Sequence, residues 1–203
     1  NFTKNLIHFS VVSKAGRNIA PFLRQISAAW YLGRFDCHAP AASAANQAFN
    51  VVFPPSQIAN SANHSKKDKH REAILFCANE ILNAIKDNLL SGSQQYQGKD
   101  SKFSVEEADA RCKQVVASSL DAYSAFWEEL AFPLLRTQQQ PNSDVDDIVL
   151  DSKAEKGKKL SIEMDKTKQV QLSILNESKF WKLSQDKESK IKAAWYKLIG
   201  SMI

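Results

Sequence analysis

The segment from Ala29 to Ser56 constrains the fold of this chain more than any other part of it. Between Pro40 and Pro54 it is rich in alanine, and its aromatic residues recur at helical spacing. Small residues on one face let a second helix approach closely, while Phe49 and Phe53 fill the resulting interface. The segment therefore predicts one helix of a packed pair and contains no catalytic group. Its small residues are Ala41, Ala44, Ala45 and Ala48.

The length of 203 residues is enough for one sizeable domain or a run of repeats. Hydrophobic residues make up 43% of the chain and charged residues 24%, so we expect a well-formed core. No apolar run reaches the roughly 18 residues that span a membrane. Because the chain begins at Asn1 without a targeting pattern, we expect a piece of a longer protein. The scattered Cys37, Cys77 and Cys112 favour a reducing compartment.

Apolar periodicity predicts helices along most of the chain. One helix carries Ile19, Phe22, Leu23, Ile26 and Trp30 on a single face. Further helices are predicted over about 39–53, 68–90, 105–133, 170–175 and 187–203. Ser104 and Glu107 have the spacing of a capping box, and we expect Pro133 to end or kink the helix that follows. Strict two-residue alternation is missing over any useful length, so we expect no sheet.

The fold class expected is all-α, with antiparallel helical pairs of roughly forty residues stacked as an α-solenoid of about six to eight helices. We expect N-terminal helical repeats over 1–136, a mobile charged linker over 137–168, and a further helical repeat over 169–203. The linker prediction rests on a glutamine run and on blocks of opposite charge. Because no fixed repeat period is found, a compact helical bundle stays open as an alternative.

Positive charge is concentrated near the beginning of the chain. Residues 1–71 hold nine Lys or Arg against two acids, whereas the remainder holds eighteen against twenty. The asymmetry indicates a polyanionic partner, although a solvated helix face explains it equally well. Arg17 and Arg24 are seven residues apart and lie opposite the apolar face, so we expect both to point outward and to contact phosphates. The candidate binding residues are Lys14, Arg17, Arg24 and Arg34.

Motifs for catalysis and metal binding are missing from the sequence. It has no P-loop, no nucleophile elbow and no Cys or His pair at metal-ligand spacing, so we expect no catalytic, cofactor-binding or metal site. Trp30, Trp127 and Trp195 lie on apolar helix faces, which favours packing in the core over stacking on nucleobases. Trp181 stays open between these two roles, because it stands at a turn beside Lys182.

Several collinear segments resemble the N-terminal domain of the listerin family. They are Ala29-Trp30, Phe35-Asp36, Pro40–Ala45, Ala48-Phe49, Phe53–Ser56, Ala73–Cys77, Glu80-Ile81 and Lys179–Lys182. The likeness covers most of the chain outside 137–168, and the polar stretch 57–72 departs from the pattern. The family is one of RING-type ubiquitin ligases of ribosome-associated quality control, built as long HEAT-like solenoids.

The resemblance implies that this chain is the cytosolic, ribosome-docking end of such a ligase, and we expect a monomer. Its implied partners are the RNA and proteins of the large ribosomal subunit and a nascent-chain sensor of the Rqc2/NEMF type. Zinc and the ubiquitin-conjugating enzyme would bind a RING outside this chain, so the chain itself is not expected to transfer ubiquitin. The alternative function is a scaffold or nuclear-transport-type solenoid that binds protein ligands.

Overall fold

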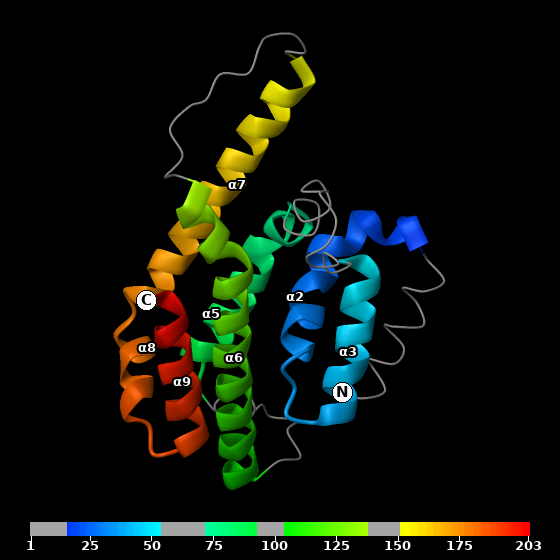
Figure 1. Cartoon of the computed structure of the whole chain (residues 1–203). Coiled ribbons are helices and arrows are strands. Elements are labelled where there is room, and N and C mark those ends of the chain that lie inside the picture. Colours follow the sequence, from blue (N-terminus) through cyan, green and yellow to red (C-terminus); the bar gives the residue numbers. More distant parts are fainter. Residues whose placement is uncertain (1–15, 54–71, 93–103, 138–150) are drawn as a thin grey trace, which may run out of the picture.

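The computed structural model describes residues 16–53, 72–92, 104–137 and 151–203. This part of the chain is all-α, as predicted, and contains no strand. Its helices stack as neighbours in a solenoid-like arrangement (Figure 1): α3 packs on α2, α2 on α5, α5 on both α6 and α7, and α6 on α9. The elements are a 3₁₀ helix η1 (Gly16–Phe22), α2 (Leu23–Gly33), α3 (Ala39–Val52), α5 (Ala78–Leu90), α6 (Val105–Thr137), α7 (Asp151–Leu175), α8 (Ser178–Lys182), a 3₁₀ helix η3 (Leu183–Gln185) and α9 (Ser189–Met202).

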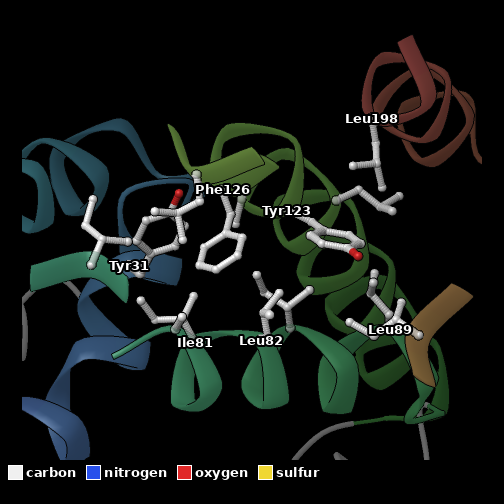
Figure 2. Close-up of a cluster of buried hydrophobic side chains, with 14 of the residues drawn as sticks. Tyr31, Ile81, Leu82, Leu89, Tyr123, Phe126 and Leu198 are labelled. Carbon is white, nitrogen blue, oxygen red and sulfur yellow. The ribbon is translucent and has the colours of Figure 1, made fainter. Parts of the chain in front are cut away.

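Helix α5 lies at the centre of the described structure. It contacts α2, α6 and α7, and its apolar residues are buried because neighbours cover it on several sides. Figure 2 shows Ile81 and Leu82 of α5 pointing toward Tyr31 of α2 and toward Tyr123 and Phe126 of α6. The apolar residues whose periodicity predicts the helix over 68–90 form a buried stripe: Ile74, Leu75, Ala78, Ile81, Leu82, Ile85 and Leu89 are all buried.

Helix α6 links α9 to α2 and α5. It has 33 residues, spans roughly 50 Å and packs on all three of these helices. Leu120, Tyr123 and Phe126 are buried in these contacts, and Leu198 of α9 lies near this cluster (Figure 2). Helix α9 adds Ile191 and Trp195 to the same core.

The pair formed by α2 and α3 confirms the prediction from the alanine-rich segment. Its four small residues are buried, and the rings of Phe49 and Phe53 stack with their centres 4.6 Å apart. Tyr31 of α2 meets the Phe49 ring edge-on at 5.6 Å. Trp30 is 2% exposed, so its predicted place in the core is confirmed.

The start of α6 has the predicted capping box. The Glu107 backbone N–H donates to Ser104 Oγ at 3.2 Å, and the Ser104 N–H donates to Glu107 Oε2 at 3.0 Å. Two backbone donors that the helix leaves unpaired are satisfied in this way. Pro133 does not end the helix, because α6 continues to Thr137, and the alternative that Pro133 kinks it stays a prediction.

The predicted extent of the linker, residues 137–168, is wrong. Within it, residues 151–168 belong to α7, and residues 138–150 lie outside the described residues. The core-facing side of this helix includes the buried Thr167, whose hydroxyl donates to the Glu163 carbonyl at 2.7 Å. A polar residue at that position interrupts the apolar periodicity by which a helix is recognised. Mobility of the 138–150 segment stays a prediction.

The helix predicted over 68–90 is interrupted. Residues 72–76 are helical, Cys77 forms a turn, and α5 begins at Ala78. The Cys77 backbone N–H donates to the Ile74 carbonyl at 3.0 Å, which is the three-residue spacing of a tight turn. Residues 68–71 lie outside the described residues.

We predict that Trp30→Ala lowers the free energy of unfolding by roughly 3–5 kcal/mol, because it removes a buried aromatic side chain and leaves a cavity. The matched control is Phe22→Ala, since Phe22 precedes the same helix but is 55% exposed. This control should shift stability by only about 0.5 kcal/mol. Urea denaturation measures both, and equal effects of the two changes would contradict the burial of Trp30.

Candidate functional site

Arg24 is held by acidic and aromatic groups of its own chain. Its Nη2 donates to Glu163 Oε1 at 2.7 Å, and its Nε lies 3.8 Å from Glu80 Oε1. The guanidinium carbon stands 4.3 Å from the centre of the Phe76 ring, a cation–π distance. Arg24 therefore points only partly outward, with 38% of its side chain exposed, and it has two acidic neighbours. The acids come from α5 and α7, which the helical wheel of α2 does not include.

The Arg24 contacts fasten α7 to α2 and α5. The Glu163 side chain is only 12% exposed, and its second oxygen accepts a hydrogen bond from Asn79 Nδ2 at 3.1 Å. The hydrogen bond from Arg24 lowers the pKa of Glu163, and the same bond raises the pKa of Arg24. Both shifts stabilise the charged forms, so the pair is ionised at neutral pH.

Arg34 lies in a second network, between α2, α3 and α6. Its Nη2 donates to Glu129 Oε1 at 3.2 Å, and its Nε donates to Asn46 Oδ1 at 3.1 Å. The guanidinium carbon is 4.3 Å from the centre of the Phe49 ring, and the side chain is 16% exposed. Packed in this way, Arg34 offers little of its charge to an external phosphate.

Tyr31 shares the acidic partner of Arg34. Its hydroxyl donates to Glu129 Oε2 at 3.0 Å. The Glu129 carboxylate on α6 thus binds both Tyr31 of α2 and Arg34, which directly follows α2. Burial raises the pKa of Tyr31 well above its usual value, and the negative charge of Glu129 raises it further. The tyrosine is therefore a neutral hydrogen-bond donor in the core and not a proton-transfer group.

The other two candidate binding residues cannot be placed. Lys14 lies outside the described residues, and so does the side chain of Arg17 at the start of η1. Of the four candidates, the two whose side chains are described, Arg24 and Arg34, each pair with a carboxylate of the chain. A binding role for any of them stays a prediction.

A second basic region, which the sequence analysis did not single out, covers α8 and α9. Residues 178–203 hold six lysines against two acids, Asp186 and Glu188. The charge balance of the longer segment had hidden this region, because residues 72–177 hold twelve Lys or Arg against eighteen acids. Counting charge in windows of one helical pair would have found it. The lysines are Lys179, Lys182, Lys187, Lys190, Lys192 and Lys197.

Aromatic rings lie within this basic region. Trp195 is buried, as predicted, whereas Trp181 is 48% exposed and Tyr196 is 62% exposed. The centre of the Trp195 ring is 5.8 Å from that of Trp181 and 5.3 Å from that of Tyr196. Trp181 Nε1 donates to the Leu175 carbonyl at 2.6 Å, which fixes the ring against the end of α7.

Trp127 on α6 is half-buried and so only partly in the core.

Neither a metal site nor a membrane span is found in the described ranges. No cluster there brings together three or more side chains of His, Cys, Asp or Glu that could hold a metal ion. No helix there is both long enough and apolar enough to cross a membrane. The buried Cys77 has a raised pKa because of its burial, which keeps its thiol protonated and unreactive.

We predict that Glu163→Gln lowers the free energy of unfolding by about 1–2 kcal/mol near neutral pH, because a charged hydrogen bond is removed while Arg24 stays partly exposed. The folded-state pKa of Glu163 is lowered, so its stabilising contribution is present above the unfolded pKa. That contribution is lost as the pH falls through the folded-state pKa. The difference between the variant and the parent should therefore shrink on acidification.

Urea denaturation across an acidic pH series measures this difference. The matched control is Asp165→Asn, an exposed acid on the same helix, which should behave like the parent at every pH. A difference between Glu163→Gln and the parent that stays constant with pH would show that the ion pair does not stabilise the fold.

Comparison with known proteins gives a consistent result. The family model described as E3 ubiquitin-protein ligase listerin, N-terminal domain, matches residues 3–203. The E3 ubiquitin-protein ligase listerin of Mus musculus is 28% identical over 95% of this chain and 8% of its own length. The listerins of Gallus gallus and Drosophila melanogaster are 26% and 27% identical, over 94% and 93% of this chain and 8% and 9% of their own lengths.

No solved structure matches the chain significantly. This chain spans less than a tenth of the length of the curated relatives that it matches. The matched region nevertheless covers nearly the whole of the chain, including the α2–α3 pair and the α8–α9 region. The chain therefore belongs to the family of listerin N-terminal domains.

Proposed function

We propose that this chain is the ribosome-docking module of a ubiquitin-protein ligase that marks stalled nascent chains on large ribosomal subunits. The observation that carries the proposal is the match of residues 3–203 to the listerin N-terminal domain. The basic character of the chain, with a net charge of +5, supports a ribosomal partner because ribosomal RNA is polyanionic. We place the module in the cytosol, as a monomer beside a nascent-chain sensor of the Rqc2/NEMF type.

Ubiquitin transfer is assigned to another part of the larger ligase. The chain holds three cysteines and four histidines, and none of them has the paired spacing that a zinc-bound RING requires. Zinc and the ubiquitin-conjugating enzyme would then belong to a RING elsewhere in that protein. The purified chain should accordingly not discharge a ubiquitin-charged conjugating enzyme.

We predict that the chain cosediments with large ribosomal subunits and less well with small subunits. Binding should weaken as salt rises, because lysine and arginine side chains that bind phosphates release counterions. If Lys14 and Arg17 bind phosphates, Lys14→Gln/Arg17→Gln should flatten the logarithmic salt slope by about one unit for each phosphate that is no longer bound. Arg24 is left unchanged, because its replacement would break the bond to Glu163. A loss of binding could then come from a weakened fold instead of a lost phosphate contact.

The charge-matched control is Lys113→Gln/Lys197→Gln. Both of these lysines are already paired within the chain, at 2.7 Å to Asp109 and 3.1 Å to Asp121. The control should bind with the affinity and salt slope of the parent. Equal binding to both subunits, or none, would contradict the docking proposal and favour a scaffold that binds protein ligands. If Lys14→Gln/Arg17→Gln binds like the parent, these two residues have no role in docking.

A further inference from the structure

Two exposed aromatic rings flank one buried ring on the surface formed by α8 and α9. Trp181 and Tyr196 each pack against Trp195, at 5.8 and 5.3 Å between ring centres, with their planes steeply inclined to it. This packing holds the two rings in place while about half of each side chain stays accessible. Rings fixed in this way lose little conformational entropy when a flat ligand stacks on them.

Two lysines belong to the same two helices as the exposed rings. Lys182 follows Trp181 directly, and Lys192 precedes Tyr196 by one helical turn, which places Lys192 and Tyr196 on the same face of α9. Lys179 and Lys197 are already engaged, with the Leu90 carbonyl and with Asp121. Among the described residues, by contrast, Lys182 and Lys192 form no ion pair.

From this juxtaposition we infer that Trp181, Tyr196, Lys182 and Lys192 form a binding surface for unpaired RNA nucleotides. Bases stack on the two rings, and the lysines contact the phosphates on either side. The inference rests on the proposed ribosome docking, and it names the chemical class of the partner and the surface that meets it. It adds a contact near the end of the chain to the candidates near its beginning.

The chemistry of the surface favours RNA over a further apolar helix. An apolar helix laid over Tyr196 would take the ammonium group of Lys192 out of water without supplying a negative charge, which is costly. RNA supplies phosphates at that point. Double-stranded RNA keeps its bases stacked inside the helix, so exposed ring faces suit unpaired nucleotides instead.

The test uses a fluorescently labelled, unpaired RNA of about twelve nucleotides, within the site size of such surfaces. A blunt RNA duplex of the same composition is the comparison ligand, and fluorescence anisotropy gives the affinities. Tyr196→Ala removes the stacking ring, whereas Tyr196→Phe keeps it. Because Tyr196 is exposed, neither change should unfold the chain, and thermal unfolding followed by circular dichroism verifies this.

We predict that Tyr196→Ala weakens binding of the unpaired RNA by about 5- to 150-fold, the usual effect of removing the ring under one stacked base. Tyr196→Phe should bind like the parent. Lys182→Gln/Lys192→Gln should flatten the logarithmic salt slope by about 0.7 units for each phosphate that is no longer bound. Lys113→Gln/Lys197→Gln is the charge-matched control and should leave the slope unchanged.

The same variants are then tested for cosedimentation with large subunits, which separates this inference from the docking proposal. If unpaired RNA binds no better than duplex, or if Tyr196→Ala binds both RNA and subunits like the parent, the inference is wrong while docking stands. If Tyr196→Ala no longer binds the subunits although the parent binds no RNA, a protein occupies the surface and the inference is wrong. If the parent binds the unpaired RNA but does not bind the large subunits, the docking proposal is wrong.

Discussion

The burial of α5 on several sides is the constraint on which the rest of the structure depends. Ile81, Leu82 and Ile85 are completely buried, and they can be so only if α2, α6 and α7 all pack against the same helix. That requirement draws in α7, although its own sequence is highly charged and weakly patterned. The long α6 then extends the core to α9, because it packs on α5 near Ser119 and on α9 near Asp121.

Arg24 of α2 and Arg34 just beyond its end illustrate how tertiary packing redirects charge. Each looks like a free cation when its own helix is considered alone, yet each meets a carboxylate from a helix far along the chain, Glu163 for Arg24 and Glu129 for Arg34. Both also lie over aromatic rings, which favours a weakly hydrated guanidinium over an ammonium group. These arginines hold helices together, so lysines without such a role are better placed to bind a partner.

Local signals predicted the elements well where the physics is local. The capping box at Ser104 depends on residues three apart, and the alanine-rich face of α3 depends on one helical period, so both could be read directly. Prediction failed where a distant neighbour decides. Residues 151–168 were expected to form a linker, because nothing in their pattern shows that α5 and Arg24 hold the second half of α7 against the core. The surface of α8 and α9 was not singled out, and Trp181 was left open between two roles, because its exposure depends on how its neighbours pack.

By itself, the sequence determined the all-α class, the buried stripe of α5, the packed α2–α3 pair and the resemblance to listerin N-terminal domains. Each of these depends on residue spacing or order, which a linear chain carries without reference to its fold. Only the tertiary structure decided which cations are paired, which aromatic rings stay exposed and how far the helical part extends. Those properties depend on distances between residues up to 139 positions apart, and such distances are fixed by the packing of helices.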